Sequence, residues 1–183
     1  MMWFTLLIAA VGLERLAELV VSKRNAAWSF ARGGVESGRR HYSVMVVLHT
    51  GLLVGSLVEV WLRRPAFLPA LGWTMLALVL AAQVLRWWCI ITLGHQWNTR
   101  VIVVPGMSRV TGGPYRFMSH PNYVAVVIEG FALPLAHSAW ITALVFTLCN
   151  AVLLSLRIRV ENRALTSMPV TAPVTPPSAE VTL

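Results

Sequence analysis

The sequence predicts an all-α integral membrane protein with about five transmembrane helices, the last two forming a helical hairpin, and with a loop region and a C-terminal helix on the cytoplasmic side. Hydrophobic residues make up 57% of the 183 residues and charged residues only 12%, and the mean hydropathy is +0.69. This composition argues against a water-soluble globule. The net charge of +8 does not indicate a nucleic-acid partner, because the basic residues stand at the ends of apolar segments instead of forming a basic domain.

The first span is predicted from Met2 to Val21. The chain begins without a basic segment or a small-residue cleavage site, which favours a retained membrane helix over a signal peptide. Glu14, Arg15 and Glu18 interrupt the apolar pattern, and the two glutamates are four residues apart, so they share a helix face. Ionisable groups at membrane depth face protein or water. We interpret them as a Glu/Arg pair at the membrane interface that closes the helix bundle.

The next two spans flank a short turn. Residues Ser22 to His41 are predicted as a strongly basic loop, followed by a second span from Val44 to Leu62. This span contains His49, which is costly inside a membrane unless it is paired, so we expect an interhelical hydrogen bond there. The third span, Leu68 to Leu93, is long enough to tilt and carries Arg86 near its far end.

The last two spans are predicted as a tight hairpin. The apolar segment Tyr123 to Leu135 reaches only about 20 Å, against a membrane core of about 30 Å. A turn through His137 and Ser138 then returns the chain as a helix from Ala139 to Leu156. Past Leu156 the helix is expected to continue into water. The tail, residues 168–183, lacks periodicity and is predicted to be disordered.

The distribution of lysine and arginine predicts the orientation. With five spans and the N-terminus outside, eleven of these residues fall on inner segments and two on outer segments. The positive-inside rule then places the C-terminus, and the polar segments beside it, on the cytoplasmic face of the membrane. The segment before the hairpin and the C-terminal helix therefore share one side of the membrane.

The stretch from Gly112 to Tyr123 concentrates polar and turn-forming residues between apolar segments. Pro121 suits the first turn of a helix, whose free N–H groups make a seat for a carboxylate or phosphate. Arg157 and Glu161 are four residues apart on one helix face, where they can hold a zwitterionic ligand. The alternatives are a plain loop and a salt-bridged helix at the membrane edge, and the residues alone leave both open.

No metal site is predicted. The chain has no aspartate, and its histidines and glutamates lack ligand spacing. The two cysteines, Cys89 and Cys149, lie in apolar runs without metal or redox spacing, so we expect both to be buried as hydrophobic residues.

Four segments together resemble the isoprenylcysteine carboxyl methyltransferase family: residues 95–100, the Gly-Pro-Tyr-Arg of 113–116, the His-Pro-Asn-Tyr of 120–123 and the Arg157/Glu161 helix. The resemblance covers roughly Leu93 to Leu165. It implies an integral membrane enzyme that uses S-adenosylmethionine, with residues 1–167 as the methyltransferase domain and 93–165 as its cofactor-binding part. Residues Arg15 to His49 look like the bacterial branch, whose members are associated with methylating hydroxyls of long-chain phenolic or pyrone lipids.

Carried over by position, the resemblance implies a cofactor pocket and places Arg157 at the reacting end of the acceptor. The chain departs from the family at Ser119, where arginine is usual, and at Asn162, where a second glutamate is frequent. The implied cofactor-binding residues are Val103, Met107, Ser108, Arg109, Val110, Tyr115, His120, Pro121, Asn122, Tyr123 and Glu161.

The expected reaction is methyl transfer to a hydroxyl or carboxylate oxygen of a lipophilic or prenylated substrate taken from the membrane lipid. Such an in-line displacement mainly requires alignment and exclusion of water. A carboxylate needs no base, whereas a phenol, with a pKa near 10, benefits from one. The candidates for this base are His49, then His41 and Glu14.

Two other functions fit the sequence. A membrane reductase of the steroid-reductase type would use NADPH, and Arg109 and Arg116 are available for its extra phosphate. The other is a non-enzymatic membrane lipid-binding protein, in which the stretch from Gly112 to Tyr123 is only a structured loop.

Overall fold

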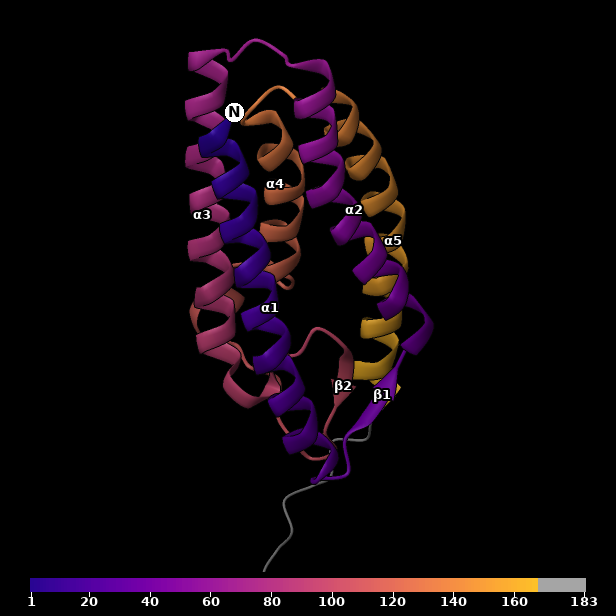
Figure 1. The fold of residues 1–183 in the computed structure, drawn as a ribbon. Coiled ribbons are helices and arrows are strands. Elements are labelled where there is room, and N and C mark those ends of the chain that lie inside the picture. Colours follow the sequence, from indigo (N-terminus) through magenta and orange to yellow (C-terminus); the bar gives the residue numbers. More distant parts are fainter. Residues whose placement is uncertain (168–183) are drawn as a thin grey trace, which may run out of the picture.

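Long helices form nearly all of the computed structural model, which describes residues 1–167, apart from the side chains at 40, 41, 165 and 167 (Figure 1). The predicted disordered tail lies outside the described residues. In chain order the elements are α1 (Met2–Phe30), β1 (Val35–Ser37), α2 (Arg39–Arg63), α3 (Pro69–Leu93), the 3-10 turn η1 (Gly94–Gln96), β2 (Val101–Val103), the 3-10 turn η2 (Gly113–Arg116), α4 (Pro121–Leu135) and α5 (Trp140–Ser167).

The chain is an all-α membrane protein apart from one short strand pair. Among the described residues, three helices are long and apolar enough to cross a membrane, over Tyr42–Arg63, Pro69–Gln96 and Trp140–Ala164. Helix α4 is apolar but has only 15 residues. Helix α1 is long enough but carries three ionisable residues in its middle. That all five helices span the bilayer stays a prediction.

The predicted basic loop from Ser22 to His41 is wrong for most of its length. Helix α1 continues to Phe30, residues Val35–Ser37 form β1, and α2 begins at Arg39. The extension is amphipathic, because Lys23 and Arg24 are exposed while Ser22 and Asn25 are buried. Basic residues on one exposed face do not end a helix whose other face packs against protein.

Helix α5 continues unbroken past Leu156, as predicted, but its last part does not lie wholly in water. Arg157, expected to stand in water, is only 9% exposed. It packs against the loops that follow α3, so the face of α5 that carries Arg157 is turned toward the protein interior.

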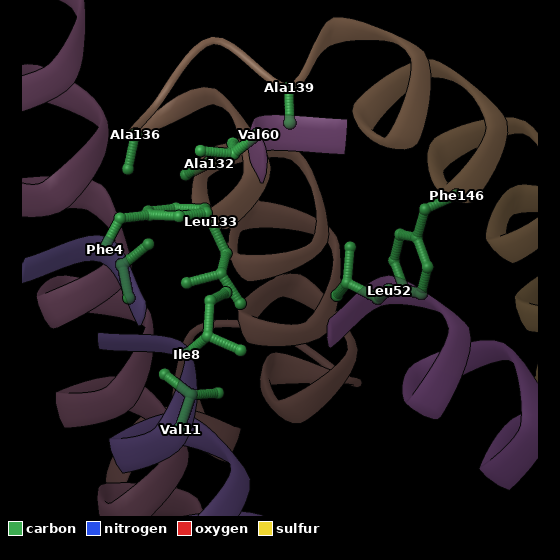
Figure 2. Close-up of a cluster of buried hydrophobic side chains, with 11 residues drawn as sticks. Phe4, Ile8, Val11, Leu52, Val60, Ala132, Leu133, Ala136, Ala139 and Phe146 are labelled. Carbon is green, nitrogen blue, oxygen red and sulfur yellow. The ribbon is translucent and has the colours of Figure 1, made fainter. Parts of the chain in front are cut away.

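A hydrophobic cluster holds the end of the bundle that contains the N-terminus, away from the strands (Figure 1). Figure 2 shows side chains of α1, α2, α4 and α5 meeting there, together with the turn between α4 and α5. Helices α4 and α5 approach so closely that a Cβ atom on Gly130 would lie 2.0 Å from Cε1 of Phe146. This packing fixes the hairpin, and with it the first turn of α4 and the polar end of α5. The expectation that both cysteines are buried is wrong for Cys149 of α5, which is exposed, whereas Cys89 is buried.

A buried ion cluster joins α1, α3 and α4 farther along the bundle. Arg15 donates to Glu18 at 2.6 Å and to Glu129 at 2.7 Å, and Arg86 also donates to Glu129. The Nε atom of Arg86 lies 3.4 Å from Glu18, and Glu14 accepts hydrogen bonds from Gln83 and Trp87. Glu18, Arg86 and Glu129 are each 4% exposed. The Glu/Arg pairing predicted on α1 is confirmed by the Arg15–Glu18 ion pair, which extends into a buried cluster of three helices. Its position at the membrane interface stays a prediction.

Glu59 of α2 caps the start of α5. Its carboxylate accepts the backbone N–H groups of Ile141 at 3.1 Å and Thr142 at 2.8 Å, and also the Thr142 hydroxyl at 2.8 Å. The first N–H groups of a helix have no intrahelical partner, and a carboxylate there also interacts favourably with the helix dipole.

Replacing this cap is expected to weaken the fold. Glu59→Ala should lower the free energy of unfolding in detergent by about 1–2 kcal/mol, measured by chemical denaturation. Arg63→Ala is the matched control, because it removes only the exposed partner 3.4 Å from Glu59 and should cost no more than about 1 kcal/mol. Equal losses for the two variants would contradict the capping role.

Candidate active site

A cavity of about 590 Å³ lies between the loops after α3, the start of α4 and the second half of α5. Strand β2 forms part of its wall and pairs antiparallel with β1, with Val35 opposite Val103 and Ser37 opposite Val101. The strand pair lies at the end of the bundle opposite the N-terminus (Figure 1). The link between α1 and α2 is thereby attached to the cavity wall.

The residues proposed for the cofactor surround this cavity. All of them line it except Pro121, which is buried as the first residue of α4. Arg157 lines the same cavity. The lining residues from that set are Val103, Met107, Ser108, Arg109, Val110, Tyr115, His120, Asn122, Tyr123 and Glu161.

The Tyr123 hydroxyl is the centre of the polar contacts. It donates to Oε2 of Glu161 and accepts from Nε of Arg157 at 2.9 Å. The His120 ring stacks on the Tyr123 ring at 5.3 Å, and its Nδ1 lies 3.7 Å from Oε1 of Glu161. Within residues 1–167, no ion pair joins Arg157 to Glu161, which argues against the simple salt-bridged helix. The phenol instead bridges an acidic and a basic group that face one cavity.

Arg157 is held by neutral partners. Its Nη2 donates to the Thr99 carbonyl and its Nη1 contacts the Met45 sulfur at 2.9 Å, in addition to the bond with Tyr123. No carboxylate forms an ion pair with it in the described part of the chain. A buried guanidinium that has no carboxylate partner interacts favourably with an anionic group bound nearby.

Three buried polar atoms beside the cavity have no hydrogen-bond partner among the described residues. They are Nε1 of Trp97, Nδ2 of Asn98 and Oδ1 of Asn122, two donors and one acceptor. Burying such atoms unpaired costs free energy, so each calls for a partner. A ligand with both donors and acceptors satisfies them.

The turn η2 places Tyr115 against α3. Gly113 has φ of +54°, and a Cβ there would lie 2.5 Å from Oγ1 of Thr92, so only glycine fits this turn. Burial, and then the neighbouring Cys89 thiol, raises the pKa of Tyr115 above its ordinary value. Tyr115 is therefore a neutral phenol in the cavity wall and is unsuited to act as a base.

Comparison with known proteins identifies the family. The sequence pattern of the isoprenylcysteine carboxyl methyltransferase (ICMT) family matches residues 75–167, half of the chain. The chain belongs to the ICMT family. It is 39% identical to the uncharacterised protein YpbQ of Bacillus subtilis over 88% of this chain and 96% of that protein. It is also 22% identical to an uncharacterised protein of Haemophilus influenzae over 92% of this chain and 98% of that protein. No solved structure matches.

ICMT family members are membrane methyltransferases that use S-adenosylmethionine, and the matched region contains Tyr123, Arg157 and Glu161. Helix α1, strand β1 and helix α2 lie outside it. Of the two departures, Ser119 lines the cavity and its carbonyl accepts a hydrogen bond from Arg109 at 3.4 Å, whereas Asn162 is exposed.

Two of the three proposed bases, His49 and Glu14, do not line the cavity. His49 contacts the Met45 carbonyl at 2.9 Å within its own helix and meets Phe146 edge-on, so the predicted interhelical hydrogen bond is wrong. Glu14 is engaged by Gln83 and Trp87. The side chain of His41 is outside the described part.

Other lining residues were not assigned to the site from the sequence, although residues 95–100 form one of the four segments that carry the family resemblance. The polar run from Gln96 to Arg100 supplies Trp97, Asn98 and Arg100, and α1 supplies Ser29. The available signal was this polar run directly after an apolar span. A second signal was a polar stripe on α1 at residues 18, 22, 25 and 29, which the basic residues beside it concealed.

Proposed function

We propose that this chain is an S-adenosylmethionine-dependent methyltransferase that methylates an oxygen of a lipophilic acceptor at the cytoplasmic face of a bacterial inner membrane. The observation that carries the proposal is the gathering of the motif residues, from separate loops and helices, around one cavity beside Arg157. The cavity volume of about 590 Å³ lies within the usual range for small-ligand sites.

The polar atoms of the cavity fit this cofactor. Glu161, joined to Tyr123, suits ribose hydroxyls or an ammonium group, and Oδ1 of Asn122 accepts from an N–H or O–H group. Trp97 and Asn98 offer donors to a carboxylate or a ring nitrogen. When bound, S-adenosylmethionine supplies an electrophilic methyl group on a sulfonium ion.

The protein's own contribution is alignment, charge and exclusion of water. Arg157 binds and orients the acceptor oxygen, since its guanidinium is buried and lacks a carboxylate partner in residues 1–167. The described base candidates, His49 and Glu14, lie outside the cavity lining. We therefore favour an acceptor oxygen that is already ionised when it binds, a carboxylate or an acidic hydroxyl.

The acceptor is proposed to reach the site from the bilayer. The outer faces of α2, α3 and α5 expose many large apolar side chains, as expected for helices in contact with lipid chains. The cofactor enters from the cytoplasm, where the positive-inside rule places the loops of the cavity.

Calorimetric titration of the detergent-purified protein tests the reaction class. S-adenosylhomocysteine is expected to bind and NADPH is not. Tyr123→Phe keeps the ring that stacks on His120 but removes the hydroxyl that joins Glu161 to Arg157. It should weaken S-adenosylhomocysteine binding about 10- to 100-fold, the loss expected for hydrogen bonds to charged groups.

The matched control is Tyr42→Phe, which removes a hydroxyl outside the cavity lining and should leave binding unchanged. Binding of NADPH alone would replace the proposal with a reductase. Binding of neither ligand would favour the non-enzymatic lipid-binding protein.

A further inference from the structure

One face of α1 carries buried polar residues beyond the ion cluster. Ser22 and Asn25 are 4% and 7% exposed, and they follow Glu18 at helical spacing. Both lie outside the region that the ICMT family pattern matches. The side chains point to a segment without regular structure, residues 97–100, and to the η1 turn before it.

Ser22 and Asn25 hold this segment directly. The Ser22 hydroxyl accepts the backbone N–H of Thr99 at 3.0 Å and lies 2.7 Å from the Thr99 hydroxyl and 2.8 Å from Oδ1 of Asn98. Asn25 donates to the carbonyls of Trp97 at 2.8 Å and Gly94 at 3.1 Å. A backbone N–H group outside helices and sheets needs such a partner, and here α1 provides it.

The same segment holds Arg157 from the other side. The Thr99 carbonyl accepts Nη2 of Arg157, whereas Tyr123 and Met45 contact the other two nitrogens. The direction of the guanidinium therefore depends on where the Thr99 backbone lies. That position is set by the Ser22 hydroxyl on the far side of the segment.

We propose that Ser22 and Asn25 are positioning residues for methyl transfer, which fix residues 94–99 so that the Thr99 carbonyl orients Arg157 toward the acceptor. This inference rests on the proposed function. It gives α1, which lies outside the family match, a defined part in the reaction. A displacement of about 1 Å at a reacting group costs up to about 100-fold in rate, so loss of one hydroxyl is expected to affect turnover more than folding.

The test compares Ser22→Ala with Ser56→Ala. Ser56 is fully buried on α2 and its hydroxyl donates to the Leu52 carbonyl in its own helix. The control therefore removes the same atom from a residue that does not line the cavity. Hydrogen exchange, followed by mass spectrometry in detergent, should be at least about tenfold faster in the peptide covering residues 94–101 for Ser22→Ala. Ser56→Ala should leave that peptide unchanged.

Kinetic measurements then distinguish a positioning role of Ser22 from a general loss of structure in the variant. With S-adenosylmethionine and a long-chain carboxylate or a long-chain hydroxypyrone as the probe acceptor, Ser22→Ala should lower kcat about 10- to 100-fold. The Kd for S-adenosylhomocysteine should rise by a much smaller factor than kcat falls, because Glu161 and Tyr123 stay in place. Ser22→Thr, which keeps a hydroxyl, should restore part of the rate. In an Arg157→Lys background, Ser22→Ala should slow turnover no further, because the two residues act as one unit.

Unchanged exchange at 94–101 would overturn the inference, as would full additivity with Arg157→Lys. A wild-type protein that binds no S-adenosylhomocysteine would overturn the proposed function instead. The two failures are thus distinguishable, because the exchange experiment requires neither cofactor nor acceptor.

Discussion

Arg157→Ala is expected to abolish methyl transfer, by about 100- to 1,000-fold or more in kcat, while S-adenosylhomocysteine binds within about threefold of its wild-type affinity. The Arg157 guanidinium is buried, lines the cavity and forms no ion pair with a carboxylate within residues 1–167. Its charge is therefore available to the acceptor oxygen. The affinity for the cofactor should persist, because Tyr123 keeps its hydrogen bond to Glu161 when the Arg157 side chain is removed. Radiolabelled methyl incorporation into probe lipids and calorimetry measure the two effects separately.

Two further arginine variants complete this experiment. Arg159→Ala, two residues along α5 at an exposed position, should behave as wild type in both assays. Arg157→Lys keeps the charge but not the planar fork, and it should retain a small part of the rate. Equal loss of turnover and of S-adenosylhomocysteine binding in Arg157→Ala would show that Arg157 serves the cofactor, which contradicts the division of roles proposed for Arg157 and Glu161.

Local sequence patterns predicted the parts of the fold that depend on consecutive residues. The apolar runs predicted α3 and the start of α5 to within a residue, because lipid-facing and core-facing positions both require apolar side chains along the whole helix. The same reasoning ended α1 too early. Lys23 and Arg24 resemble a loop unless Ser22 before them and Asn25 after them are recognised as part of one buried helix face. The strand pair β1–β2 has three residues in each strand, too few for a period-two pattern.

The residues of the candidate site also fall into two groups: those assigned from the sequence, and those that are brought together only by tertiary packing. The site residues from Val103 to Tyr123 were assigned from the resemblance to the family, and the structure gathers all of them except Pro121 around one cavity. The contact between Ser22 and Thr99 joins residues 77 positions apart, and nothing in either local sequence specifies the partner. Arg86 was likewise noted on its own helix, but its partners Glu18 and Glu129 belong to α1 and α4. Such contacts are consequences of tertiary packing.

Arg86→Met is expected to lower the free energy of unfolding in detergent by about 3–5 kcal/mol, the largest stability change predicted here. Arg86 is 4% exposed and neutralises Glu18 and Glu129, so its removal leaves three buried or partly buried carboxylates with Arg15 alone. Chemical denaturation followed by circular dichroism measures the loss. Arg39→Ala is the surface control, because it breaks an ion pair with Glu36 in which the arginine is 82% exposed, and it should cost at most about 1 kcal/mol.

A second substitution distinguishes charge imbalance from lost packing. Glu129→Gln added to Arg86→Met removes one of the excess negative charges and keeps an oxygen for Arg15, so the double variant should be more stable than Arg86→Met alone. If the double variant is less stable than the single one, packing of the long Arg86 side chain is the main contribution. The cluster also links α1 to α4, the helices that carry Ser22 and Tyr123. A destabilised but folded Arg86→Met protein should therefore show faster hydrogen exchange at residues 94–101, which joins the stability of the bundle to the geometry of Arg157.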